Sequence, residues 1–358
     1  MLIEVLAMRK LILLGTGNAM VTKCFNTCFA LNIDDEYFLV DAGGGNGILA
    51  QLEKAQIDMT KIHHLFITHA HTDHVIGVIW VVRKIATLMN QGKYEGKLHI
   101  YCHDKVKMVV ETIANLTLKK KDLAQIGKNI IFDVVEDGDQ REILDMQVIF
   151  FDILSTKEKQ FGFSAEFADG MNLCCLGDEP YNDVCEIYAQ NSDYLLSEAF
   201  CLYGDRDIFK PYEKHHSTVK EACELAEQLQ VKNLILYHTE DKHIDKRKEL
   251  YTDEGKQYYY GNLYVPDDLD VGTGVKGFIT NENINFKGLN SNLVFTATRK
   301  FGDFSTNLLL GQQISDTRNN YGNQRGEGLL ISGFNNISNT TNKFVSNTGE
   351  QVQRNIGY

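Results

Sequence analysis

The sequence lacks long apolar runs, and it lacks the cysteine spacing of zinc-binding or disulfide-rich proteins. None of its apolar stretches approaches the roughly 20 residues that a membrane-spanning helix needs. The segment Met1–Lys10 has no small-residue cleavage site after it, so we expect no secretion signal and no membrane association. The 8 cysteines show no Cys-x-x-Cys pairs, which excludes a zinc knuckle or a compact disulfide framework and indicates free thiols in a reducing cytoplasm.

Histidine, cysteine and proline are all missing from the last quarter of the chain. All 11 His, 8 Cys and 3 Pro fall within residues 1–270. This part carries a net charge of −15, whereas the whole chain carries −12. Residues 271–358 carry +3 and contain 15 Asn and 12 Gly. The sequence therefore predicts one domain over 1–270, large enough to bury its own core, and an Asn/Gly-rich tail over 271–358, β-rich or poorly ordered, which is not an independent domain.

Short apolar segments alternate with amphipathic ones from Lys10 to Tyr264, which is typical of an α/β layer structure. One predicted helix, 218–228, begins with Thr218 and Glu221 at the spacing of a capping box. Four predicted strands lead directly into residues that can bind metal or transfer protons, namely His69, Asp178, Glu198 and His238. Because strand ends on one edge of a sandwich can converge, we expect these residues to meet at one site.

Four metal-binding side chains fall within six consecutive positions: His69, His71, Asp73 and His74. They lie where a predicted strand ends and a helix begins. This geometry lets the first two side chains point to one place and the last two to a second place nearby. Such a cluster suits two adjacent metal ions. Imidazoles and carboxylates are the ligands expected of Zn²⁺, with Mn²⁺ or Fe²⁺ as alternatives.

The segment from His69 to His74 resembles the His-x-His-x-Asp-His motif of the metallo-β-lactamase superfamily. The stretches Ser197-Glu198-Ala199-Phe200 and His215-His216-Ser217-Thr218 are similar to those of its ribonuclease Z group, and the resemblance spans about residues 10 to 268. It implies the αβ/βα sandwich of that superfamily and a metal-dependent hydrolase, most similar to a phosphodiesterase.

The resemblance also implies a role for each site residue. His69 and His71 would hold the first metal, Asp73, His74 and His238 the second, and Asp178 both. Asp73 and Asp178 would orient a metal-bound hydroxide, and His216, supported by Glu198, would be the general acid. A carboxylate beside His216 would raise the pKa of that histidine. The segment Asp41–Gly44 would orient the histidine loop through hydrogen bonds.

One family ligand is missing. The family places a further histidine before the strand that leads to the bridging aspartate, but residues 151–163 contain none, and Ser155 stands near its place. Three alternatives are open. The protein holds one metal only, at Asp73, His74, Asp178 and His238; or His103 fills in; or Lys157 holds an anionic group there. We expect two Zn²⁺, or one if nothing compensates.

The charge and the missing segments bear on the substrate. We find no Gly/Pro-rich basic insertion resembling the arm with which ribonuclease Z grips transfer RNA, and the charge of −15 disfavours nucleic acids. We therefore expect a small anionic or phosphodiester substrate rather than transfer RNA. The alternatives are an ester or lactone hydrolase and a low-turnover metal-containing sensor. A homodimer is compatible with the superfamily.

The tail predicts two alternating strands, Asn292–Lys300 and Asp303–Gln312, around a turn at Phe301-Gly302. They resemble a fragment of the barrel of TonB-dependent outer-membrane receptors, although two strands cannot close a barrel. An outer-membrane fragment on an acidic cytoplasmic enzyme has no coherent cellular address. We therefore favour an accidental fusion or chimera over a genuine extension, and expect the tail to be unnecessary for activity.

Overall fold

The computed structural model describes residues 9–272, 278–329 and 340–357, and the side chains of 9–272 and 290–316. The chain divides into two compact units, Met1–Gly272 and Thr273–Tyr358. In the described part of the chain no helix has both the length and the apolar character needed to cross a membrane.

The first unit contains two seven-stranded sheets packed face to face. The first sheet has the order β14-β1-β2-β3-β4-β5-β6, with β1 Arg9–Gly15, β2 Cys28–Ile33, β3 Glu36–Val40, β4 Ile62–Phe66, β5 Leu98–Cys102, β6 Ile130–Val134 and β14 Val271–Gly272. The second has the order β13-β12-β11-β10-β9-β8-β7, with β7 Gln140–Ile143, β8 Met146–Asp152, β9 Phe161–Phe167, β10 Asn172–Cys175, β11 Tyr194–Glu198, β12 Asn233–Tyr237 and β13 Asn262–Tyr264.

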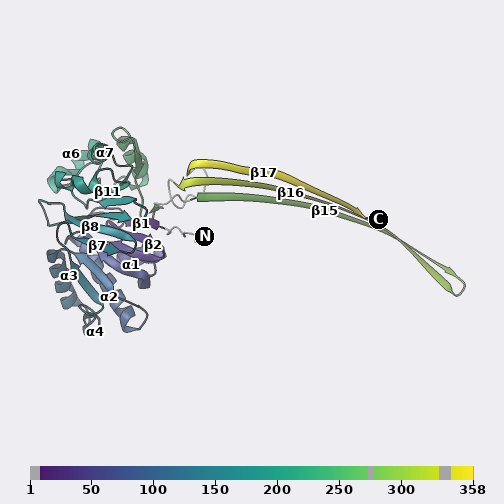
Figure 1. Cartoon of the computed structure of the whole chain (residues 1–358), viewed down its shortest axis with the longest axis horizontal. Helices are drawn as coiled ribbons and strands as arrows, with labels where there is room; N and C mark the ends of the chain where they lie inside the picture. The colour runs from purple at the N-terminus through teal and green to yellow at the C-terminus, as the bar shows by residue number, and fades with distance from the viewer. Residues whose placement is uncertain (1–8, 273–277, 330–339, 358) are drawn as a thin grey trace. The chain divides into compact units, whose positions relative to one another are not determined.

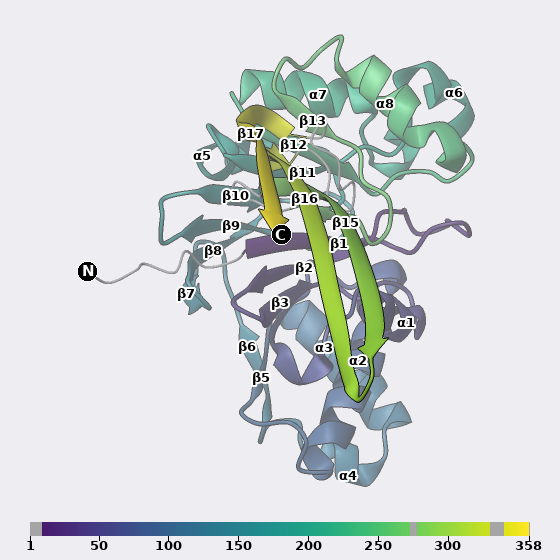
Figure 2. The same ribbon diagram turned by 90° about the vertical axis from the view of Figure 1, so that its right-hand side faces the viewer.

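Helices cover the outer face of each sheet, as Figures 1 and 2 show. They are α1 Gly47–Lys54, α2 Thr72–Asn90, α3 Asp104–Thr117 and α4 Lys120–Leu123 beside the first sheet, and α5 Glu186–Ala189, α6 Arg206–Phe209, α7 Val219–Gln228 and α8 Arg247–Gly255 beside the second. One apolar cluster fills the space between the sheets, and one more lies beneath each helical layer. The predicted αβ/βα sandwich is therefore confirmed.

Burial explains why the central strands are apolar throughout. All six residues of β2 are buried, since one face of the strand meets the helices and the other meets the second sheet.

The predicted capping box is present at α7, where Oε2 of Glu221 accepts hydrogen bonds from the backbone N–H and the hydroxyl of Thr218, each at 2.8 Å. All eight cysteines are free, as expected.

The first unit continues two residues past the predicted boundary at residue 270. The short strand β14 pairs with β1, with Val271 opposite Ile12 and Gly272 opposite Leu11. The second unit is a three-stranded antiparallel sheet, with β15 Phe278–Phe301, β16 Phe304–Leu329 and β17 Thr340–Gly357. The predicted hairpin is confirmed. Phe301 pairs with Phe304, and Gly302 takes a φ of +58°, which favours glycine in this turn.

Candidate metal centre

The predicted convergence of strand ends is observed. The strands β10, β11 and β12 run parallel, and their carboxyl ends lead into Asp178, Glu198 and His238. Strand β4 lies in the other sheet and leads through Ile67 and Thr68 into His69. Ligands from both sheets therefore meet at one edge of the sandwich.

Two groups of side chains lie close enough to hold a metal ion each. The first cluster consists of His69, His71 and Asp178, and the second cluster of Asp73, His74, Asp178 and His238. Within each cluster the ligand atoms lie within 4.8 Å of one another. Asp178 belongs to both clusters. It therefore lies where a residue shared by two metal ions was expected.

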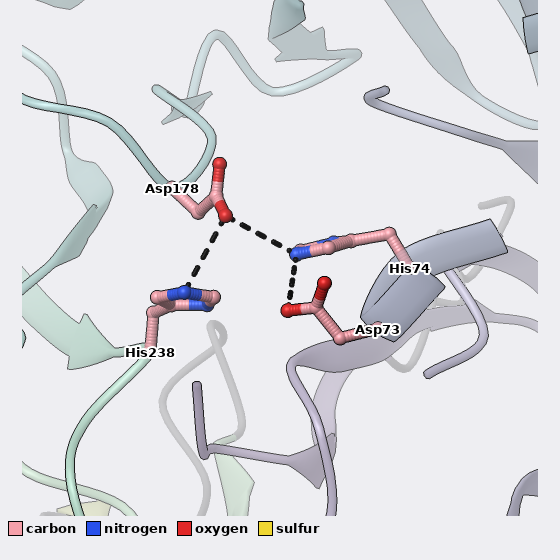
Figure 3. Close-up of side chains that lie close together, drawn as sticks. All are labelled: Asp73, His74, Asp178 and His238. Carbon is pink, nitrogen blue, oxygen red and sulfur yellow. Dashed lines mark ion pairs between the residues drawn. The ribbon is translucent and has the colours of Figure 1, made fainter. Parts of the chain in front are cut away.

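The second cluster is almost fully buried and draws on both sheets (Figure 3). Nε2 of His74 lies 3.3 Å from Oδ2 of Asp73 and 3.3 Å from Oδ2 of Asp178. Nε2 of His238 lies 3.4 Å from the same oxygen of Asp178. In the first cluster, Nε2 of His69 lies 2.9 Å from Nδ1 of His71 and 3.7 Å from Oδ1 of Asp178.

Neighbouring groups fix which nitrogen of three histidines faces the clusters. The hydroxyl of Thr68 donates to Oδ2 of Asp41 at 2.8 Å, so its oxygen accepts from Nδ1 of His69 at 2.9 Å. Oδ2 of Asp41 also accepts from Nδ1 of His74 at 2.8 Å. These bonds leave Nε2 of both histidines for the clusters. The predicted orienting role of the segment at Asp41 is thus observed as hydrogen bonds.

His238 is oriented in the same way from the first sheet. The hydroxyl of Thr27 donates to the carbonyl of Gly17 at 3.0 Å, so its oxygen accepts from Nδ1 of His238 at 3.1 Å. Nε2 of His238 therefore faces Asp178. Neither Thr27 nor Thr68 could be predicted as a site residue, because a threonine carries no metal-binding signal and acts here only through a histidine.

The electrostatics of the second cluster favour a bound cation. Burial opposes the charge of Asp178, but His69, His238 and His74 hold the pKa of this carboxyl well below its usual range. Burial also opposes charge on His74, but Asp73, Asp41 and Asp178 raise its pKa well above normal. Nε2 of His74 is buried and has no hydrogen-bond partner among the residues that the structure describes. These residues fit a divalent cation, which would supply the positive charge that the ionised carboxylates need.

His216 lies against the clusters but differs from the prediction in its pKa. Its Nδ1 donates to the backbone carbonyl of Asp178 at 2.9 Å, and its ring stacks on Phe200 with centroids 4.9 Å apart. Nδ1 lies 3.6 Å from Oε2 of Glu198. The expected rise in the pKa is wrong: burial, followed by the charge of His238, lowers the pKa of His216 to about 3. Burial raises the pKa of Glu198 well above normal, so this carboxyl offers His216 little negative charge.

The loop that lacks the family histidine runs beside these residues. Oγ of Ser155 accepts from the backbone N–H of Lys157 at 3.2 Å, so this side chain stabilises the loop turn. Nζ of Lys157 donates to the carbonyl of Lys214 at 3.1 Å. After burial, the charge of Lys157 is among the causes that lower the pKa of His71, His216 and His238.

Two buried side chains near Asp178 were not predicted. Nε2 of Gln160 donates to Oδ1 of Asp178 at 2.8 Å, and Glu179 is buried beside it in the chain. His103 is buried as well, with its ring 5.4 Å from that of Phe161, and it belongs to neither cluster. The alternative in which His103 replaces the missing histidine therefore has no support. Gln160 could have been noticed from its place directly before the Phe161-Gly162-Phe163 strand.

Similar proteins carry the same fold. The chain is 26% identical to ribonuclease Z of Thermococcus sibiricus over 306 residues, which covers 74% of this chain and 96% of the relative. The metallo-β-lactamase fold protein YhfI from Bacillus subtilis superimposes with a TM-score of 0.61 at 19% identity, covering 75% of this chain and all of YhfI. Human tRNase Z, short form, gives 0.58 at 21% identity, covering 74% and 98%. The metallo-β-lactamase fold is thereby confirmed.

The predicted resemblance of the tail to outer-membrane receptors finds no support in these comparisons. A family model described as "Anti-Pycsar protein Apyc1" matches residues 9–257, which is well over half of the chain and includes both clusters, His216 and Glu198. The chain therefore belongs to the anti-Pycsar protein Apyc1 family.

Proposed function

We propose that this chain is a metal-dependent phosphodiesterase that acts on small phosphodiesters. The observation that carries the proposal is the sharing of Asp178 by two clusters in which only His71 is not buried, with His216 held against the same residue. Two adjacent cations suit displacement at phosphorus, because they stabilise both the attacking and the leaving oxygen. The relatives named ribonuclease Z support a phosphodiester rather than an acyl substrate.

The donor set favours Zn²⁺, and we propose one ion for each cluster. The first cluster would hold its ion through His69, His71 and Asp178, and the second through Asp73, His74, Asp178 and His238. When bound, the ions would polarise the phosphoryl oxygens and make a water molecule more acidic. Imidazole nitrogen and carboxylate oxygen are ordinary Zn²⁺ ligands, and Mn²⁺ or Fe²⁺ suits the same set.

Asp73 would orient the attacking water. Burial opposes its charge, but His74 and His238 lower the pKa of Asp73 further than burial raises it, so its carboxylate stays ionised and can only accept hydrogen bonds. An ionised carboxylate at this place fixes the direction of a water O–H bond. Its contribution is orientation, because so weak a base takes up little of the proton.

His216 would move a proton at Nε2. The carbonyl of Asp178 can only accept, so Nδ1 of His216 keeps its hydrogen and Nε2 is the nitrogen that exchanges protons. With a low pKa, Nε2 is unprotonated at neutral pH; it would accept the proton that the attack releases and pass it to the leaving oxygen. Glu198 accepts a hydrogen bond from the backbone N–H of Ser217 and so positions the loop that carries His216.

The charge pattern favours a small substrate. Residues 1–270 carry a net charge of −15, which repels a long polyanion. Lys157 supplies an exposed positive charge near the clusters, where it could meet one phosphate group. The relatives nevertheless include a tRNase Z, so transfer RNA is the rival substrate that the experiment must separate.

The test compares substrates and variants on metal-loaded protein. Hydrolysis of bis(p-nitrophenyl) phosphate, a cyclic mononucleotide and a transfer RNA with a 3′ extension would be measured beside that of an aryl ester and a lactone. His216→Ala should lower kcat on the phosphodiesters by about 100- to 10 000-fold. His243→Ala is the matched control, since His243 is half-exposed and pairs with Asp205 at 3.3 Å.

Each outcome decides between the readings. Turnover of the small phosphodiesters that depends on His216 supports the proposal. Activity only on the esters or lactones would point to an acyl hydrolase, and cleavage of the transfer RNA alone would replace the substrate class. Metal binding without any turnover would favour a sensor. Size-exclusion chromatography of the same samples tests whether the chain forms a homodimer.

A further inference from the structure

The side chain of Gln160 belongs to the segment, residues 151–163, that lacks the family's further histidine. It is the last residue of the loop before β9, and it is only 1% exposed. Its Nε2 donates to Oδ1 of Asp178 at 2.8 Å. A polar side chain buried this deeply, in contact with the residue that both clusters share, needs an explanation other than solvation.

The contact is made to the oxygen of Asp178 on the side of the first cluster. Oδ2 of Asp178 carries the contacts to His74 and His238, and Figure 3 shows the other oxygen turned away from these two histidines. That other oxygen, Oδ1, lies 3.7 Å from Nε2 of His69. The amide of Gln160 and the imidazole of His69 therefore lie next to the same carboxylate oxygen.

The other end of the amide has no partner. Oε1 of Gln160 is buried and accepts no hydrogen bond in the described part of the chain. A buried carbonyl left without a partner is unfavourable, because it has given up its hydrogen bonds to water. An amide oxygen is a good neutral ligand for a divalent cation, and a half-turn about the last side-chain bond exchanges the oxygen and nitrogen without moving the rest of the residue.

The backbone holds Gln160 in this position from two sides. The N–H of Phe161 donates to the carbonyl of Thr68 at 3.0 Å, which ties the residue after Gln160 to the residue before His69. Gly177 lies over the amide, and a Cβ atom at this position would come within 2.2 Å of Nε2 of Gln160. The glycine before Asp178 therefore leaves the space that the amide occupies.

We propose that Gln160 completes the first cluster, with Oε1 as a protein ligand in place of the missing histidine. This inference rests on the proposed metal-dependent function. The first cluster would then contain two imidazoles, one carboxylate and one neutral oxygen. Because an amide oxygen is a harder and weaker ligand than imidazole, the first cluster should bind Zn²⁺ more weakly than the second and accept Mn²⁺ readily.

The experiment measures metal binding rather than activity. Metal-free protein would be titrated with Zn²⁺ by calorimetry and with Mn²⁺ by electron paramagnetic resonance. In the unaltered chain we expect two ions, one tighter than the other. Gln160→Leu should lower the affinity for the more weakly bound ion by about 10-fold or more and leave the affinity for the more tightly bound ion unchanged. Gln160→Glu, which keeps an oxygen and adds a charge, should tighten it. Gln190→Leu, at an exposed position, is the control.

The outcomes separate this inference from the proposed function. Two ions bound equally well by the unaltered chain, Gln160→Leu and Gln160→Glu would overturn the role of Gln160 and leave the metal site intact. An unaltered chain that binds no ion would overturn both. Thermal unfolding of the metal-free variants shows whether each is folded. If Gln160→Leu does not fold, the tightening expected for Gln160→Glu, or its absence, still decides.

Discussion

Asp41 accepts a hydrogen bond from Nδ1 of His74 at 2.8 Å, although Asp41 belongs to neither cluster. The same oxygen, Oδ2, accepts from the hydroxyl of Thr68, which in turn orients His69. One carboxylate therefore orients a histidine of each cluster. Asp41 itself adopts a φ of +55°, a left-handed conformation that a non-glycine residue takes only when its surroundings hold it there.

Replacing Asp41 should weaken both clusters without removing a ligand. In Asp41→Asn the amide can present a donor toward Nδ1 of His74, which disturbs the orientation of its ring. We expect metal affinity to fall by about 10- to 100-fold, measured by calorimetry. Asp35→Asn, at an exposed position that also has a positive φ, is the control. Unchanged affinities in Asp41→Asn would show that the ring is oriented by packing alone.

Lys157→Ala should weaken substrate binding more than it slows the reaction. Lys157 is exposed, and after burial its charge is among the causes that lower the pKa of three histidines at the site, so we expect it to attract a substrate phosphate. We expect KM to rise about 5- to 10-fold with little change in kcat, and the effect to shrink at high salt. Lys159→Ala is the control, because Lys159 pairs with Asp104 at 2.7 Å. A fall in kcat alone would argue against a binding role.

His216 should make the metal-free protein less stable as the pH falls. Its pKa is lowered to about 3 in the folded chain, against an ordinary value of 6.5, so protonation favours the unfolded chain. The penalty is absent above pH 6.5 and grows as the pH falls toward 3, by at most about 1.4 kcal/mol per pH unit. Denaturant unfolding of the metal-free protein would be measured between pH 7.5 and 5. The free energy of unfolding should fall less steeply with falling pH in His216→Gln than in the unaltered chain. Equal slopes would contradict the low pKa.

Gly77→Ala should destabilise the start of α2. A Cβ atom at Gly77 would lie 1.8 Å from the carbonyl oxygen of Ala42, and the N–H of Gly77 donates to the carbonyl of Gly43 at 2.7 Å. Because the clash is with backbone, we expect a loss of about 3 kcal/mol in the free energy of unfolding. Gly45→Ala meets nothing within 4 Å and should cost less than about 0.5 kcal/mol. Urea denaturation of both variants makes the comparison.

A chain that ends at Gly272 should retain the activity. The first unit contains every residue of both clusters and ends with β14, which pairs with β1. We expect kcat/KM within about twofold of the full chain and a thermal midpoint within about 2 °C. Ending the chain at Asp270 removes β14 and should lower the midpoint measurably. Loss of activity in the chain ending at Gly272 would give the tail a role.

The sequence predicted the parts of the site that follow from motif spacing. The residues from His69 to His74 and the strand ends at Asp178 and His238 come together as expected, since parallel strands end on the same edge. Contacts between distant segments could not be predicted in this way. The hydroxyl of Thr27 reaches His238 across 211 positions, and the pKa of His216 depends on burial and on His238 more than on Glu198.

Both clusters need parts of the chain that are synthesised far apart in time. His69 to His74 follow β4 of the first sheet, whereas Asp178 and His238 follow strands of the second. A nascent chain that has not yet released His238 from the ribosome can assemble only part of the second cluster. If the second cluster holds the proposed ion, all four of its ligands are available only after the second sheet has docked on the first. A bound ion would then slow the separation of the two sheets, because its ligands come from both of them.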